Sequence, residues 1–154
     1  MVQIVLNLLQ RLRQFLLWIW QQEGTPAQRA RGMALGVFSG CFPFFGFQTL
    51  LGVMLASLFR GNRLLAATGT WISNPFTYLP LYWLNYKIGS SVLRDNRAAP
   101  ELSHLTRQEL WDQGWFFSSR LLLGSTMIGI ILGLITGLSV YFVLKFFSKE
   151  KNVF

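Results

Sequence analysis

A long charge-free stretch, Gly32–Phe59, dominates the chain; it reads GMALGVFSGCFPFFGFQTLLGVMLASLF and is interrupted by Pro43. A second one, Leu64–Tyr86, reads LLAATGTWISNPFTYLPLYWLNY and is interrupted by Pro75. Apolar length without charge indicates a membrane protein. Because hydrocarbon offers no water to unpaired backbone groups, a helix broken at membrane depth is tolerated only where protein or a wet cavity covers the break. We therefore expect both breaks to lie inside a helical bundle.

The composition also favours a membrane protein over a soluble one. Of the 154 residues, 52% are hydrophobic and 13% are charged, whereas a soluble domain has about a quarter of its residues charged. The formal net charge is +8, and the lysines and arginines flank the apolar stretches. Contact with anionic headgroups explains that placement better than nucleic-acid binding does. We expect the lipid bilayer as a partner and no nucleic acid.

The patterning predicts one all-α integral membrane domain over residues 1–154, in four parts. Residues 1–24 form an amphipathic interfacial helix, because apolar residues recur at three and four and Arg11 and Arg13 make a full crossing costly. Residues 25–89 hold the two broken stretches as re-entrant or kinked helical hairpins, after an N-cap at Thr25 with Pro26. Residues 90–120 form a polar loop with a short helix, and residues 121–147 form a transmembrane helix.

The terminal helix carries glycines at a spacing of four, which places Gly129, Gly133 and Gly137 on one face. Small residues at this spacing let another helix approach closely. Two interpretations stay open: a seam with a second copy or with another membrane subunit, and packing against helices of the same chain.

The candidate site consists of the polar residues in and between the broken stretches. The candidate amides and hydroxyl are Gln48, Asn62, Ser73 and Asn74, and the residues that shape the turns are Pro43, Gly46 and Pro75. An amide in an apolar setting can satisfy backbone groups that a proline leaves free. Alternatively, facing half-helix ends with amides can bind a small ion or a polar headgroup.

One set of ordered residues resembles a known family. It comprises Pro26, Ala30, Gly32, Ala34, Gly36-Val37-Phe38, Pro43-Phe44, Gly46, Gln48-Thr49, Asn62, Thr70-Trp71-Ile72-Ser73-Asn74-Pro75, Tyr82 and Gly89. This pattern is similar to the bacterial membrane family called domain of unknown function 2062. The resemblance implies an integral protein of a bacterial inner membrane, or of an internal membrane such as a thylakoid. Some relatives resemble fusions to glycosyltransferases, but this chain carries no nucleotide-sugar signature.

Catalytic chemistry has little support in the sequence, and no metal or cofactor is expected. The single histidine, His104, lies in a polar segment without a ligand cluster. No phosphate-binding loop or nucleophile–base pattern is present. We expect a non-catalytic accessory, assembly or scaffold subunit in a larger membrane complex. The alternatives are a small channel- or transporter-like protein that uses the two breaks, and a membrane partner of an envelope lipid or glycan enzyme.

The basic residues also bear on topology. If both broken stretches turn back, Arg29, Arg31, Arg60, Arg63 and the segment 87–120 all lie on one side of the membrane, as the positive-inside rule favours.

Overall fold

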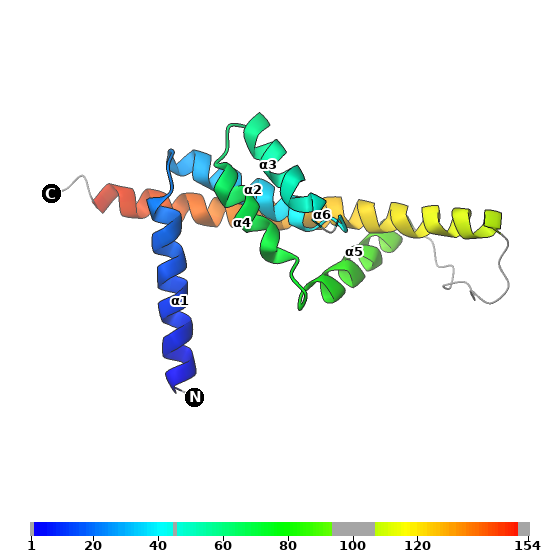
Figure 1. The fold of residues 1–154 in the computed structure, drawn as a ribbon, viewed down its shortest axis with the longest axis horizontal. Coiled ribbons are helices and arrows are strands. Elements are labelled where there is room, and N and C mark those ends of the chain that lie inside the picture. Colours follow the sequence, from blue (N-terminus) through cyan, green and yellow to red (C-terminus); the bar gives the residue numbers. More distant parts are fainter. Residues whose placement is uncertain (1, 45, 94–106, 151–154) are drawn as a thin grey trace.

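The computed structural model describes residues 2–44, 46–93 and 107–150, and these residues fold into helices joined by short turns (Figure 1). The helices are α1 (Val2–Gln21), α2 (Pro26–Gly40), α3 (Phe47–Leu58), α4 (Arg63–Gly69), the 3₁₀ turn η1 (Thr70–Ile72), α5 (Tyr78–Val92) and α6 (Arg107–Glu150). Residues 94–106 of the polar loop expected over residues 90–120 lie outside the described residues, and residues 107–120 belong to α6.

The longest helix, α6, is the spine on which the other helices pack (Figure 1). It has 44 residues, which at about 1.5 Å per residue gives roughly 66 Å. The short helix expected within residues 90–120 and the membrane helix expected over residues 121–147 belong to one continuous helix, because no proline interrupts the sequence from Arg107 to Glu150. In the described part of the chain, one segment, Gly114–Phe146, is long and apolar enough to cross a membrane by length and composition.

Helix α2 begins where the sequence predicts. Thr25 is the N-cap, its hydroxyl accepts a hydrogen bond from the backbone N–H of Gln28, and the Gln28 side chain accepts one from the Thr25 N–H. Pro26 occupies the first turn, where its missing N–H costs no hydrogen bond. This capping box fixes the start of the helix that contacts most of the bundle.

The first broken stretch folds back on itself. After the break, α3 packs against α2 and returns the chain to the start of α2. The backbone N–H of Asn62 donates to the carbonyl of Gln28 at 2.9 Å, and Gly61 lies against the backbone of Gly32. The two ends of this stretch are therefore adjacent.

The second broken stretch continues forward, in contrast to the expected pair of hairpins. Helix α4 runs parallel to α2, since Asn62 lies against Gly32, Ala66 against Gly36 and Thr70 against Gly40. Helix α5 keeps the same sense and packs against α6 (Figure 1). The stretch is kinked at Pro75 because α5 finds its packing partner in α6 rather than in α4.

The glycine face of α6 lies against α2 of the same chain. A Cβ at Gly133 would meet the carbonyl oxygen of Ala34 at 2.8 Å, and one at Gly137 would meet the Cβ of Ala34 at 2.8 Å. A Cβ at Gly129 would lie 3.0 Å from the carbonyl oxygen of Phe38. Of the two interpretations of these glycines, the structure shows the intramolecular contact, and the helices run antiparallel.

The first helix touches the bundle at its C-terminal end. Ile19 joins Met33, Leu65 and Leu144 in a buried cluster, with Trp18 packed against it. From there α1 extends across the direction of α6, near the C-terminal end of that helix (Figure 1). The contact at the C-terminal end of α1 thus positions this helix, and the rest of α1 projects beyond the bundle.

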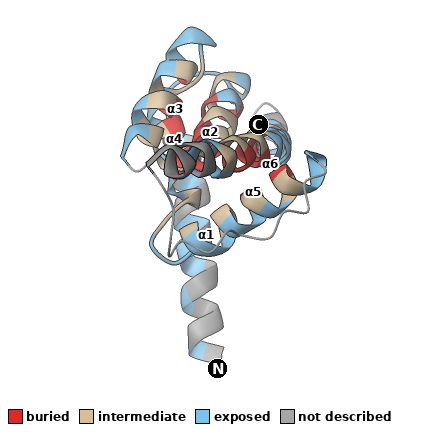
Figure 2. Ribbon diagram, turned by 90° about the vertical axis from the view of Figure 1, so that its right-hand side faces the viewer, coloured by how far each residue is buried: buried red, intermediate tan, exposed pale blue. Residues whose placement is uncertain are grey.

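Burial is concentrated where α2, α4 and α6 meet (Figure 2). Many of the exposed residues are large and apolar. The apolar outer face, as we define it, comprises exposed residues of α3, α5 and α6. They are Phe47, Leu50, Met54, Leu58, Leu79, Trp83, Leu84, Ile130, Ile131, Leu134, Ile135, Leu138, Phe142 and Phe146. Large exposed apolar areas are uncommon on soluble monomers, so these side chains are suited to hydrocarbon or to other protein.

Candidate functional site at the helix breaks

The two breaks, residues 41–46 and 73–77, lie together because α2 and α4 run side by side in the same direction. A Cβ at Gly40, the last residue of α2, would lie 2.7 Å from the Ile72 side chain and 2.9 Å from the Thr70 carbonyl oxygen. Both breaks therefore leave open helix ends at the same level of the bundle. Open carbonyls at such ends need hydrogen-bond donors.

Asn85 supplies a donor to the first break from α5. Its side chain is fully buried, and its Nδ2 donates to the carbonyl of Cys41 at 2.8 Å and to Ser125 Oγ at 2.9 Å. One amide thereby ties the end of α2 to both α5 and α6. Its Oδ1 is buried and has no hydrogen-bond partner among the described residues.

Tyr82, one turn earlier on α5, connects the two breaks. Its hydroxyl donates to the carbonyl of Phe42 at 3.3 Å and lies 3.1 Å from Ser73 Oγ. Ser73 was expected to contribute to the site, and the structure places it in this contact. The hydrogen bonds of Tyr82 and Asn85 together cap two successive carbonyls at the end of α2.

A second pair of hydroxyls forms a hydrogen bond between α3 and η1. Thr49 Oγ1 and Thr70 Oγ1 are 3.0 Å apart, and Thr70 Oγ1 also donates to the carbonyl of Ala67 at 2.7 Å. Ser39 beside them is fully buried and donates to the carbonyl of Leu35 at 2.7 Å. These hydroxyls bond to each other or to their own helix.

Asn74 serves the backbone of the second break. Its Oδ1 accepts hydrogen bonds from the N–H groups of Phe76 at 2.9 Å and Thr77 at 3.2 Å, and its own N–H donates to the Thr77 hydroxyl at 3.0 Å. This is the Asx-turn arrangement in which an asparagine side chain replaces missing backbone partners. Pro75 follows it and starts the turn that leads into α5.

Gln48 is placed differently. Its backbone N–H donates to the carbonyl of Phe44 at 2.9 Å, but its side-chain Oε1 is buried without a hydrogen-bond partner among the described residues. Gly46 precedes α3 with a φ of 81°, a conformation that favours glycine. A Cβ at Gly46 would meet nothing within 4 Å, so its backbone angle rather than crowding requires glycine.

Asn62 lies away from the breaks, at the start of α4. Its Oδ1 caps that helix by accepting from the Leu65 N–H at 2.9 Å, and its Nδ2 donates to the carbonyl of Glu23 at 2.9 Å. Asn62 thereby holds three segments together at the opposite end of α2. The structure does not bring it to the other candidate residues.

Sequence reasoning missed Asn85, Ser125 and Thr70 as members of the network. The available signal was an amide or hydroxyl inside a charge-free stretch, which must find a partner once buried. Asn85 sits near the end of the second stretch, and Ser125 follows a glycine of the terminal helix. In the described part of the chain, no group of three or more His, Cys, Asp or Glu residues could hold a metal ion.

The fold and the site together define an all-helical protein whose longest helix is long and apolar enough to span a membrane. The chain belongs to a family of uncharacterized proteins conserved in bacteria, DUF2062, whose sequence profile matches residues 9–152. Comparison with curated proteins and with solved structures gave no match.

Proposed function

We propose that this protein is a non-catalytic integral membrane protein that acts as a scaffold or accessory subunit beside other membrane protein subunits in a bacterial inner or internal membrane. The apolar outer face carries this proposal. Small residues hold α2, α4, α5 and α6 together on the inside, while large apolar side chains face out. That is the arrangement expected of helices packed in lipid.

The two ends of the apolar part of α6 support a crossing. Arg120 and Lys145 bracket the charge-free segment Leu121–Leu144, and a hydrocarbon core of about 30 Å needs roughly 20 residues. The ammonium of Lys145 lies 5.6 Å from the ring centre of Tyr141. Basic and aromatic side chains of this kind suit the headgroup zone.

The aromatic rings at the other end of the bundle suit a second interface. The ammonium of Lys87 lies 4.9 Å from the Trp83 ring centre, and Trp115 is exposed. Trp71 is 77% exposed and Phe76 91% exposed. Such rings are costly in water and favourable at the level of lipid headgroups.

A topology follows from this proposal. The α2–α3 pair enters and returns on the same side, the kinked run from α4 to α5 crosses, and α6 crosses back. Arg31, Arg60 and Arg63 then share one side with Lys145, and Arg120 lies on the other. The positive-inside rule makes the side with the three arginines cytoplasmic.

The hydrogen bonds at the breaks favour a scaffold over a conduit. A conduit needs polar groups that face a passing solute, whereas Asn85, Tyr82, Thr70 and Asn74 bond to the chain itself. One observation favours the channel-like alternative: Gln48 Oε1 is buried with no partner among the described residues.

Gentle purification from the native membrane after mild cross-linking tests the proposal. We expect the protein to remain in the membrane fraction after alkaline washing and to co-purify with defined membrane subunits. Reconstituted vesicles test the alternative. Movement of ions or lipids that Gln48→Leu removes at equal protein content, without any co-purifying subunit, would replace the scaffold by a conduit.

A further inference from the structure

Several exposed arginines gather at one end of the bundle. Arg60 and Arg63 flank the turn that packs against α2 where Arg31 lies, since a Cβ at Gly61 would lie 2.8 Å from the backbone nitrogen of Gly32. Because α6 runs antiparallel to α2, Leu144 joins the cluster with Met33 and Leu65 at this same end. Lys145 follows it and is exposed. We call this surface, with Arg13 of α1, the arginine end.

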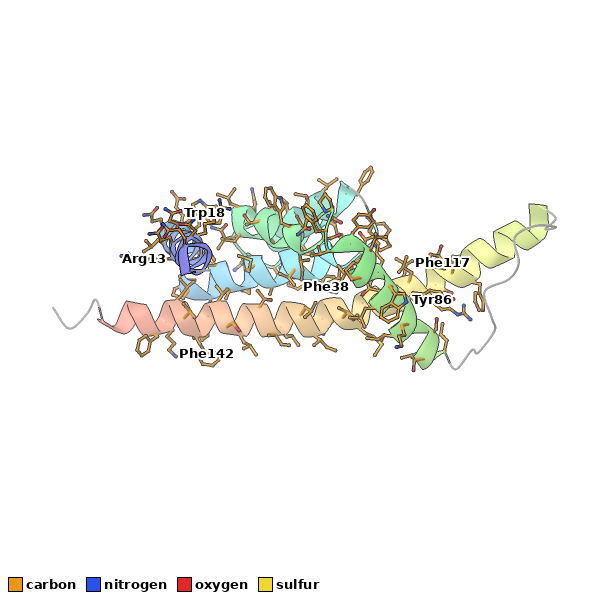
Figure 3. All side chains as sticks on the ribbon, turned by 90° about the horizontal axis from the view of Figure 1, so that it is seen from below. Arg13, Trp18, Phe38, Tyr86, Phe117 and Phe142 are labelled. Atoms are coloured by element: carbon orange, nitrogen blue, oxygen red, sulfur yellow. The ribbon has the colours of Figure 1, made fainter. Side chains whose placement is uncertain are left out.

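Helix α1 lies across this end with Arg13 facing outward (Figure 3). Figure 3 shows Arg13 on the side of α1 that faces away from the other helices, toward the C-terminal end of α6. Both Arg11 and Arg13 are exposed. At 3.6 residues per turn, residues two positions apart are separated by about 160° around the helix axis. The two arginines therefore lie on opposite edges of the polar strip of α1.

That placement is typical of a helix in a membrane surface. An arginine at the edge of the polar strip can lay its methylene chain along the apolar boundary and extend its guanidinium to a phosphate. The polar strip between the two arginines carries Asn7, Gln10 and Gln14, which are all exposed. The sequence pattern predicts an apolar stripe opposite that strip, which suits the acyl boundary.

We propose that the arginine end, formed by α1 and by Arg31, Arg60, Arg63 and Lys145, is a binding surface for the anionic phospholipid headgroups of the leaflet in which α1 lies. The proposal rests on the proposed membrane function and adds the lipid class that the protein selects. A bilayer surface matches the geometry because α1 runs across α6, the helix that spans, and so lies parallel to that surface. Each basic residue close to an anionic leaflet strengthens attraction by about fivefold.

The experiment uses the full chain reconstituted in phosphatidylcholine with trace spin-labelled phosphatidylglycerol or spin-labelled phosphatidylcholine. The motionally restricted fraction of each label gives the selectivity of the lipids that touch the protein. We expect phosphatidylglycerol to be preferred at low salt and the preference to fall in 1 M salt, where the screening length is only about 3 Å. A variant with Arg13→Gln, Arg31→Gln, Arg60→Gln and Arg63→Gln should lower the selectivity ratio strongly toward one, with Arg11 and Lys145 keeping part of the preference.

Charge-conserving substitution is the control. The same four positions changed to lysine should keep most of the preference, because the attraction needs positive charge more than guanidinium geometry. A glutamine variant that stays folded and keeps its full selectivity would overturn the proposal. So would a parent protein that restricts both lipids equally, in which case the arginines serve an acidic protein or a nucleic acid. If neither label is restricted, the membrane function itself fails, which is a different result.

Discussion

Replacing Asn85 with leucine tests whether α5 holds the first break. Leucine keeps the branched shape and the number of side-chain heavy atoms, so the substitution removes hydrogen bonds without leaving a cavity. The carbonyl of Cys41 and Ser125 Oγ each lose a donor that lies at 2.8 and 2.9 Å. A buried polar group left unpaired costs about 1–3 kcal/mol.

The net effect is smaller than the sum of these two costs. Asn85 Oδ1 is itself buried without a partner among the described residues, and leucine removes that penalty. Two groups lose their donor and one unpaired oxygen is removed, so the substitution adds about one unpaired buried group. Hydrogen bonds between membrane helices average only about 0.6 kcal/mol each. With two such bonds removed, we expect the free energy of unfolding to fall by about 1–2 kcal/mol. For a chain of this size that lowers the midpoint of thermal unfolding by roughly 2–8 °C.

Thermal unfolding in detergent, followed by circular dichroism, measures this change. Ser125→Ala and the Asn85→Leu/Ser125→Ala double variant complete a cycle. The double variant should be more stable than the two single effects predict when added, because alanine removes the hydroxyl that Asn85→Leu leaves unpaired. Leu84→Ala, at an exposed position of the same helix, controls for a general weakening of α5. An Asn85→Leu protein as stable as the parent would refute the argument that α5 caps the break.

Three other predictions follow from the same geometry. Gly133→Leu should force α2 and α6 of one chain apart, so thermal stability in detergent should fall sharply at every protein concentration. A loss of stability that depends on protein concentration would instead indicate a dimer contact. Gln48→Leu should leave stability unchanged or raise it, because it removes an unpaired buried oxygen. Asn74→Leu should cost about 1–2 kcal/mol, because it leaves backbone N–H groups of the second break without an acceptor. Thermal unfolding scans compare the two variants, and equal losses of stability would contradict this assignment. Single cysteines at Arg63 and Ser118, in a background lacking the native cysteine, should react with membrane-impermeant maleimide from opposite sides; labelling of both from one side would exclude the crossing of α4–α5.

Local sequence signals predicted the helix boundaries that depend on neighbouring residues. Thr25 and Pro26 mark the start of α2, and the prolines with their flanking residues mark both breaks. Such features depend on φ angles and missing N–H groups, which the nearby sequence determines.

Partners distant in sequence could not be predicted in the same way. The glycines of α6 show the same spacing whether they meet α2 or a second copy, so the pattern indicates a face without naming its partner. The two proline breaks look alike locally, yet one chain segment folds back and the other runs on. Tyr82 and Asn85 hold α5 to the carbonyls of Phe42 and Cys41, about 40 residues away, and such distant partners cannot be inferred from the local sequence. Inside the site, the hydrogen bonds of Asn74 reach residues two and three positions away and can be expected from local sequence, whereas those of Asn85 cannot.

The parallel contact between α2 and α4 has a consequence for synthesis. Gly32, Gly36 and Gly40 meet residues that lie 30 positions later in each case, so one side of α2 gains its neighbour soon after it leaves the ribosome. The opposite side meets Gly129, Gly133 and Gly137, which are made some ninety to a hundred residues later. During that interval the nascent chain carries a half-covered α2 whose break carbonyls have α5 but not yet α6. Helix α6 is therefore made well after α2, and its arrival covers the side of α2 that α4 leaves open.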